Sequence, residues 1–514
     1  MEITPWAKVG GLADVLSGLP AAQARAGDRP TVVVPAHGGG TWPREQARPL
    51  PGPSPRFTLG GVEFRADLSR LEHPGGFEVV LVGNPALYDR REIYGPDRPA
   101  AGYPDAIVRR ALLARAALYV ALLGGRLPDV VHAHDAASAL VIPLLDALRS
   151  TPLQHARSVF SIHNLGYLEG FPAESFRYSG LASTDGGMPP TCELHGAFSA
   201  IKAAVILADR IQTVSPTYAR EVTEDPSIGG PLGAFLRARG SDFTGVLNGV
   251  DLDEWNPRTD RHIAAPFDSG GMAGREACRR DLWELASFLP ARRGEPEPVV
   301  VGVVSRLAYQ KGLDILAAAI PTLVKEGFRF ALVGTGEAGL EDDLLRLGLA
   351  HPGLVWTALN PAEGMARRLF AGSDIFCVPS RYEPCGLTQQ YALLYGSIPV
   401  VRRTGGLADT VSPEVGFLFD GVDPESLAAA VLRAGAAARD PRRRSAMQAA
   451  GMSRGRSWDE AARELRSRVY EGREDPRHGA SRRTRRNGSP RTAPVQAPVS
   501  RWRAAPPSFR RPAP

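Results

Sequence analysis

The segment of the chain with the most specific chemistry is Pro379–Thr388, which reads Pro-Ser-Arg-Tyr-Glu-Pro-Cys-Gly-Leu-Thr. Glu383 stands in a rigid turn after a strand, and Gly386, Leu387 and Thr388 would then open a helix. A helix N-terminus attracts phosphate, and a neighbouring carboxylate can hold sugar hydroxyls. The segment therefore predicts a site for a sugar carried on a phosphate, and a capping or turn carboxylate is the alternative for Glu383.

A second segment, Ser305–Gly312, reads Ser-Arg-Leu-Ala-Tyr-Gln-Lys-Gly and joins an apolar strand to a helix. Arg306 and Lys311 would project at the carboxyl end of that strand, which is where open α/β sheets bind their ligands. Both cations suit the oxygens of a diphosphate. The alternative is a surface loop with two solvated charges.

A third segment, Lys8-Val-Gly-Gly-Leu12, is followed by Asp14. Adjacent glycines before a helix let backbone N–H groups approach an anion, and Lys8 adds positive charge. The chain has only four lysines, so the position of two of them beside glycines is a further hint of phosphate binding. An ordinary turn is the alternative, because such motifs are common in isolation.

Short apolar strands alternate with longer helical patterns along the chain. The predicted strands are Thr31–Pro35, Val130–His134, Ser158–His163, Arg210–Val214, Val299–Ser305, Phe328–Gly334, Asp374–Pro379 and Ile398–Arg402. The predicted helices include Asp314–Glu326, Pro424–Arg439 with Asp423 as its N-cap, and a helix from Ser457 to about Tyr470 that opens with a capping box. This alternation predicts an α/β fold with two doubly wound, mainly parallel sheets that face one cleft.

Length and composition predict a multidomain protein. The 514 residues suggest two or three domains, and 43% of them are hydrophobic. We predict an N-terminal domain over 1–248, a C-terminal domain over 249–455 and a helix over 456–472 that crosses back to the first domain. Ten arginines and one acid lie between Asp475 and Pro514, a local charge of +9 that leaves the rest of the chain slightly acidic, so the basic character belongs to a tail, 473–514, that we expect to be disordered.

Cysteine usage and hydropathy limit the class of protein further. Cys192, Cys278, Cys377 and Cys385 show no C-x-x-C spacing, so we expect neither a disulfide framework nor a zinc site, and we expect a cytoplasmic location. Cys385 could be a nucleophile, but a small packing residue is the interpretation we favour. No apolar stretch is long enough to cross a membrane, and Ala111–Gly125, interrupted by Arg115, is interpreted as a buried helix.

Taken together in their order along the chain, the motifs resemble those of bacterial glycogen synthases and plant starch synthases, glycosyltransferase family 5. The matching segments are Lys8–Val15, Val131–Asp135, Ile162–Tyr167, Ala208–Glu221, Leu247–Pro257, Ser305–Asp314, Pro379–Gln389 and Val401–Val411. Any one could be accidental, but the ordered set spans nearly all of residues 3–470.

This resemblance implies a GT-B fold, in which two Rossmann-like domains enclose the active site. It implies transfer of glucose from ADP-glucose to the non-reducing end of glycogen or another α-1,4-glucan, with retention of configuration. The residues that it assigns to catalysis are Glu383, His163 and Asp14. Those that it assigns to the donor are Lys8, Gly10, Gly11, Arg306, Lys311, Cys385, Gly386, Leu387 and Thr388.

We expect no cofactor and no metal, since the two cations and a helix N-terminus can stabilise the leaving diphosphate. Nor do we expect a nucleic-acid or membrane partner. Family members carry an apolar strand before the Lys8 motif, where this chain has Met1, and an aromatic residue for the adenine where it has Pro361. A start upstream of Met1 is the interpretation we favour for the strand. The alternatives are a GT-B enzyme that uses UDP-glucose and a weakened, glucan-binding relative.

Overall fold

The computed structural model describes residues 1–95, 102–123, 127–183, 187–291, 293–362 and 364–471. Met1–Tyr470 pack as one compact unit, and the predicted tail over 473–514 lies outside the described residues. We call the part built around the strands up to Gly245 the N-terminal lobe, and the part built around the strands from Val299 to Phe419 the C-terminal lobe. The predicted domain boundaries at 248 and 455 remain predictions.

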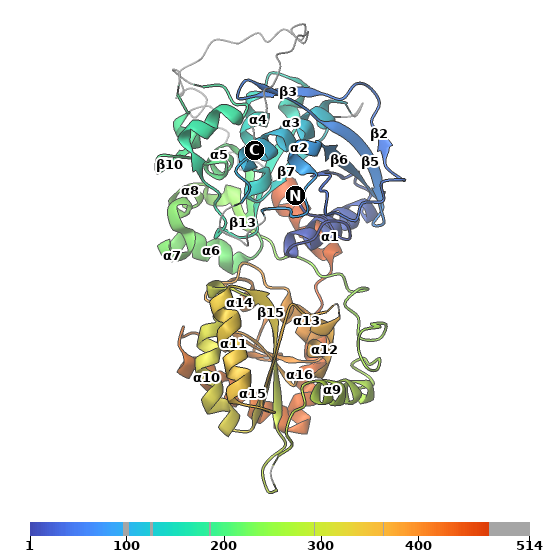
Figure 1. Cartoon of the computed structure of the whole chain (residues 1–514), viewed down its shortest axis with the longest axis vertical. Coiled ribbons are helices and arrows are strands. Elements are labelled where there is room, and N and C mark those ends of the chain that lie inside the picture. Colours follow the sequence, from blue (N-terminus) through green and yellow to red (C-terminus); the bar gives the residue numbers. More distant parts are fainter. Residues whose placement is uncertain (96–101, 124–126, 184–186, 292, 363, 472–514) are drawn as a thin grey trace, which may run out of the picture. The chain divides into compact units, whose positions relative to one another are not determined.

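The C-terminal lobe is built on a six-stranded sheet in which every pair of neighbours is parallel. Its strand order is β16-β15-β14-β17-β18-β19. Helices cover both faces, with α10, α11 and α15 on one side and α9, α12, α13 and α16 on the other (Figure 1). The strands are β14 (Val299–Leu307), β15 (Phe328–Gly336), β16 (Val355–Leu359), β17 (Ile375–Val378), β18 (Ile398–Arg402) and β19 (Phe417–Phe419). The helices are α9 (Ala273–Leu285), α10 (Leu313–Lys325), α11 (Ala338–Ala350), α12 (Met365–Gly372), α13 (Thr388–Leu394), α14 (Gly405–Thr410), α15 (Pro424–Arg439) and α16 (Pro441–Met452).

The N-terminal lobe contains two separate four-stranded sheets. The first has the order β1-β6-β5-β2 and consists of β1 (Thr31–Pro35), β2 (Arg48–Pro49), β5 (Asp67–His73) and β6 (Phe77–Gly83). The second is fully parallel, has the order β13-β12-β8-β7 and consists of β7 (Val130–His134), β8 (Arg157–Ile162), β12 (Arg210–Thr213) and β13 (Phe243–Gly245). Small antiparallel pairings add β3 (Arg56–Leu59), β4 (Val62–Arg65), β9 (Phe171–Pro172), β10 (Glu193–Leu194) and β11 (Ala197–Phe198).

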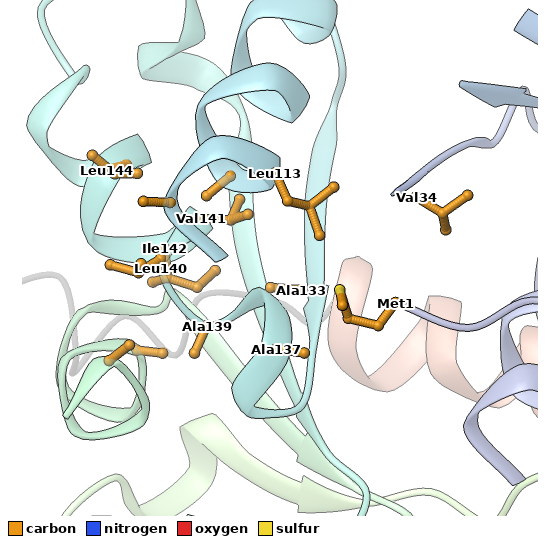
Figure 2. Packing of buried hydrophobic residues seen from close by; sticks show 14 of the residues in the cluster. Met1, Val34, Leu113, Ala133, Ala137, Ala139, Leu140, Val141, Ile142 and Leu144 are labelled. Carbon is orange, nitrogen blue, oxygen red and sulfur yellow. The ribbon is translucent and has the colours of Figure 1, made fainter. Parts of the chain in front are cut away.

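Strands β1 and β7 are the end strands of these two sheets. Figure 2 shows the side chain of Met1 between Val34 of β1 and Ala133 of β7, and all three belong to one buried cluster. Val32 and Val33 are only half-buried, unlike the fully buried valines of the neighbouring β6. Only the first two valines of β1 are therefore incompletely covered, whereas Val34 is fully buried.

The helices of the N-terminal lobe surround these sheets. They are α1 (Gly11–Arg25), α2 (Pro85–Tyr88), α3 (Ala106–Leu123), α4 (Val141–Ala147), α5 (Ala200–Leu207), α6 (Pro216–Glu224), α7 (Pro226–Gly229) and α8 (Gly233–Arg237). The apolar segment expected to form a buried helix lies within α3, apart from residues 124 and 125, which are not described. No helix in the described part of the chain is long and apolar enough to cross a membrane.

The last described helix, α17 (Trp458–Leu465), returns to the N-terminal lobe and packs on α1. Ser457 and Glu460 form the predicted capping box. The helix continues to Tyr470 as predicted, and its last turn, Arg466–Tyr470, is π-helical rather than α-helical. The turn places the Tyr470 hydroxyl 2.8 Å from Nδ1 of His132.

The sequence pattern located eight of the strands in the described part of the chain, β1, β7, β8, β12, β14, β15, β17 and β18, but missed the parallel strands β6, β13, β16 and β19 and the antiparallel strands β2 to β5. The predicted bounds of β1, β7, β18 and α15 agree with the structure at both ends. Strands β2 to β5 pair antiparallel, and β5 alternates exposed and buried residues because only one of its faces is covered. A search for continuous apolar runs does not find a strand such as β5, whereas β6 is such a run and was overlooked.

We predict that Trp458→Ala destabilises the protein by about 3–5 kcal/mol, because it empties the centre of the α1–α17 contact. Trp458 is 6% exposed, and its indole fills the space beside Gly18. The neighbouring Asp459→Ala is the control: its ion pair with Arg25 is half-exposed, and its loss should cost less than about 1 kcal/mol. Urea unfolding measures the loss of stability in both variants, and equal losses would contradict the placement of Trp458 at the centre of the α1–α17 contact.

Candidate active site

Glu383 lies in the turn between β17 and α13 and is 6% exposed. Its Oε2 atom is 2.6 Å from Nζ of Lys311 and accepts a hydrogen bond from the Ser380 hydroxyl at 2.9 Å. The structure thus brings together the carboxylate and one of the cations that the sequence singled out. A buried ion pair needs such an additional hydrogen bond to offset the loss of water from both charges.

Lys311 ends a short 3-10 turn, Tyr309–Lys311, that links β14 to α10. The next residue, Gly312, has a φ of 65°, and a Cβ there would lie 2.1 Å from the carbonyl oxygen of Pro379. Only glycine fits this position. Gln310, which is buried, donates a hydrogen bond to the carbonyl of Tyr382 at 3.1 Å. The two segments predicted to bind a sugar phosphate are therefore held against each other by backbone contacts.

The glycines of the segment Arg402–Asp409 support the Glu383 turn from its other side. Gly405 has a φ of 44°, and a Cβ on it would lie 2.0 Å from the carbonyl oxygen of Glu383. Gly406 donates its N–H to that carbonyl at 3.0 Å and passes equally close to the backbone of Cys385. Because Gly405 and Gly406 have no side chains, this segment can pack directly against the backbone of Glu383 and Cys385.

Cys385 is buried, and burial raises the pKa of its thiol to about 12. A thiol with so high a pKa is a poor nucleophile at neutral pH. All four cysteines are free and buried. These findings favour the packing interpretation of Cys385 over the nucleophile interpretation.

In the N-terminal lobe, Lys8 and Asp14 form an ion pair with 2.6 Å between Nζ and Oδ1. Lys8 remains half-exposed, so its ammonium can also reach a ligand. Gly10 is extended, with φ −147° and ψ −169°, and precedes α1. A Cβ on Gly11 would lie 3.6 Å from Cδ1 of Leu387. The glycine loop of one lobe is therefore adjacent to the Gly386–Thr388 segment of the other.

His163 follows β8 and belongs to a row of three histidines. Its Nε2 is 3.0 Å from Nδ1 of His134, whose ring stacks on that of His132. Its backbone N–H donates to Asp135 at 2.7 Å. Burial lowers the pKa of all three imidazoles, that of His132 to about 3, so the rings are neutral at physiological pH.

Arg306 extends from β14 across to the N-terminal lobe, where its guanidinium lies 5.8 Å from the ring centroid of Tyr167. Nearby, Asn164 and Gln310 form a hydrogen bond of 3.4 Å between the lobes. In the part of the chain that the structure describes, neither Arg306 nor His163 makes a hydrogen bond or ion pair with Glu383. Arg306, like Lys311, nevertheless follows the buried part of β14, where that strand approaches the other lobe.

Two helices join the lobes through a reciprocal exchange of carboxylates. Asp409 of α14 accepts hydrogen bonds from the Ser215 hydroxyl and from the N–H and hydroxyl of Thr217, at the start of α6. Glu221 of α6 accepts in turn from Thr404 and the Gly405 N–H, at the start of α14. Each carboxylate thus caps the N-terminus of the other helix.

Several residues that support the site were not singled out from the sequence. Glu2 binds the glycine loop, Gln310 connects three segments, and Asp409 and Glu221 join the lobes. All but Glu2 lie inside motifs that the sequence did reveal. The chemistry of Gln310, Asp409 and Glu221 was not apparent because each acts on a backbone group distant in sequence.

Comparison with known proteins agrees with this geometry. The starch synthase catalytic domain family matches residues 1–238, and the family of group 1 glycosyl transferases matches residues 298–436. A glycogen synthase from Anaeromyxobacter sp. (strain Fw109-5) is 38% identical over 483 residues, which cover 90% of this chain and 96% of that protein. A glycogen synthase from Desulfatibacillum aliphaticivorans is 35% identical over 91% of this chain and 96% of its own length.

The chain belongs to the glycogen synthase family. The catalytic domain of starch synthase IV from Arabidopsis thaliana, solved with ADP and acarbose, superimposes with a TM-score of 0.81 at 29% identity, covering 92% of this chain and 97% of that one. A sucrose-phosphate synthase from Thermosynechococcus elongatus shares the fold, with a TM-score of 0.54 at 18% identity over 95% of this chain and 96% of its own. The predicted family and GT-B fold are confirmed, and the protein is a glucosyltransferase of the glycogen and starch synthase type.

We predict that Gly405→Ala lowers the rate of glucosyl transfer by about 100-fold, because a methyl group there must displace the backbone of Glu383. The control is Gly339→Ala in α11, where a Cβ would meet no atom within 4 Å and should leave activity unchanged. Initial rates of both purified variants test this. A fully active Gly405→Ala variant would show that the Glu383 turn tolerates the shift.

We also predict that the free energy of unfolding decreases as the pH falls below about 6.5. The unfolded chain then protonates its histidines, whereas the buried imidazole of His132 stays neutral down to a pKa of about 3. Between pH 6 and 5, His132→Gln should make the slope shallower by up to about 1.4 kcal/mol per pH unit. Urea unfolding of both proteins measures this, and identical slopes would be the contrary result.

Proposed function

We propose that the protein transfers glucose from ADP-glucose to the non-reducing end of an α-1,4-glucan such as glycogen, with retention of configuration. The observation that carries this is the Lys311–Glu383 pair, held between two segments of the C-terminal lobe, one of which reaches the N-terminal glycine loop where Leu387 lies beside Gly11. The starch synthase IV neighbour, solved with ADP and acarbose, supports both ligand classes. A cytoplasmic location remains a prediction.

In this proposal, the diphosphate of the donor lies against Lys311 and Arg306, with the backbone of Gly386, Leu387 and Thr388 beside it. Lys8, Gly10 and Gly11 approach the phosphates and the sugar from the N-terminal lobe. Negative charge develops on the phosphate oxygens as the glycosidic bond breaks, and fixed cations stabilise that charge without having to reorganise. Cys385 acts by packing under this segment rather than by bonding to the sugar.

Glu383, His163 and Asp14 are the proposed catalytic residues. Glu383 is close enough to Lys311 to hold sugar hydroxyls while the lysine holds the phosphate. His163, neutral because it is buried, can donate or accept one hydrogen bond to the glucose. Asp14 orients Lys8 through their ion pair. Attack by the acceptor hydroxyl on the face that the phosphate leaves would retain the configuration, and closure of the lobes would exclude water.

We predict that Glu383→Ala lowers kcat by at least about 100- to 1,000-fold, because the transferred glucose loses its partner in the transition state. Lys311→Ala should raise the KM for the donor as well as lower kcat. Lys325→Ala, an exposed lysine at the end of α10, is the matched control and should leave both unchanged. Transfer of labelled glucose to glycogen measures these effects, and a Glu383→Ala variant with normal kcat would remove Glu383 from the site.

The same assay distinguishes the donors. ADP-glucose should give a higher kcat/KM than UDP-glucose, although Pro361, two residues after β16, stands where an aromatic residue was expected to stack on the adenine. A preference for UDP-glucose would favour the alternative GT-B enzyme. Glucan binding without turnover of either donor would favour a relative that has lost catalysis.

A further inference from the structure

Glu2 is a buried carboxylate whose contacts all point at the glycine loop or at its support. The residue is 3% exposed. Its Oε2 atom accepts hydrogen bonds from the backbone N–H groups of Val9 and Gly10, each at 2.7 Å. Its Oε1 atom accepts a hydrogen bond of 2.5 Å from the hydroxyl of Tyr94.

Successive backbone N–H groups form a concavity that binds anions, and a ligand phosphate is the usual occupant. Here the two successive N–H groups of Val9 and Gly10 both donate to one oxygen of a carboxylate that belongs to the protein itself. The segment is closed a second time by Ile3 and Ala7, which exchange two backbone hydrogen bonds of 2.8 Å. The loop that carries Lys8 is therefore held in place by hydrogen bonds within residues 2–10 of the protein itself.

Tyr94 completes the arrangement from the other side of the carboxylate. Burial and the neighbouring Glu2 raise the pKa of the Tyr94 phenol well above its ordinary value, so the phenol keeps the proton that it donates. The guanidinium of Arg110 lies 5.9 Å from the Tyr94 ring centroid and forms an ion pair with Glu169. Glu2 is thus fixed by buried neighbours rather than by solvent.

The loop has one open side. A Cβ at Gly10 would meet no atom within 4 Å, whereas one at Gly11 would contact Leu387 of the C-terminal lobe. Because the N–H of Gly10 is already bonded to Glu2, the contribution of Gly10 to a ligand is the space beside its Cα. Lys8 and Gly11 are left as the parts of the loop whose hydrogen-bond donors can reach a phosphate.

We infer that Glu2 is a positioning residue for the nucleotide-sugar donor: its carboxylate accepts the N–H groups of Val9 and Gly10, as a phosphate would, and so presents Lys8 and Gly11 to the donor in a fixed geometry. This inference rests on the proposed function. If Glu2 orders the loop when the protein folds, the loop loses no further conformational entropy when the donor binds. Loss of the carboxylate should therefore weaken donor binding specifically.

The test is steady-state kinetics of the full chain with ADP-glucose and glycogen varied separately. Glu2→Ala should raise the KM for ADP-glucose by about tenfold or more, since two charge-assisted hydrogen bonds to the loop are lost. The KM for glycogen should stay within about twofold of the parent value. A merely structural loss would instead lower the amount of active enzyme and leave the donor KM unchanged.

A conservative variant separates shape from charge. Glu2→Gln keeps an oxygen that can accept both loop N–H groups, and its amide N–H₂ can donate to the Tyr94 hydroxyl, so the donor KM should be largely restored. Glu72→Ala, an exposed glutamate on β5, is the control and should match the parent protein. If Glu2→Ala does not fold, Glu2→Asp, whose oxygens fall short of the loop, must raise the donor KM in its place.

Hydrogen exchange gives a readout that is independent of turnover. The amides of Val9 and Gly10 should exchange faster in Glu2→Ala or Glu2→Asp, while those of β8 keep their protection. An unchanged donor KM in a folded Glu2 variant would overturn the inference and leave the proposed function intact. If the parent protein itself transferred no glucose from any nucleotide donor, the proposed function would fail first.

Discussion

The buried ion pair between Lys311 and Glu383 is the interaction on which the site depends. Both groups lose most of their hydration, so the pair is stable only where the backbone sets their distance and Ser380 supplies a further hydrogen bond. Glycines at positions 312, 405 and 406 allow the three chain segments around the pair to approach to backbone contact. These three glycines and the two charged residues are therefore explained by the need to hold the buried pair at a fixed distance.

The second lobe supplies the complementary half of the site. The Lys8 loop contacts the C-terminal lobe at Gly11 and Leu387, and Asn164 contacts Gln310. The protein therefore divides the tasks: the C-terminal lobe holds the charges expected to face a diphosphate, and the N-terminal lobe adds a loop and a neutral histidine row. Neutral imidazoles suit contact with an uncharged sugar better than imidazolium ions would, because they can both donate and accept.

The sequence predicted the C-terminal lobe better than the N-terminal lobe, for a physical reason. Strands such as β17 and β18 are buried on both faces and read as continuous apolar runs. Strand β5 is covered on one face only, and its alternating pattern was not recognised. Lys311 and Glu383 were identifiable because each lies in a short segment of the sequence, between a strand and a helix, whose residue types and spacing already suggest phosphate binding. The partners of a carboxylate such as Glu2 were not, because they depend on where the backbone folds back.

Helices α6 and α14 carry a consequence for motion. Each of the two carboxylates, Asp409 and Glu221, belongs to one helix and bonds to the first residues of the other. Pulling the helices apart would expose both anions and strand the hydroxyls and amides that they bind, all in the same displacement. The hydrogen bonds at this junction therefore break together rather than one by one. Small displacements of the two helices are opposed by all of these bonds, whereas a displacement large enough to break them meets little further resistance from this junction.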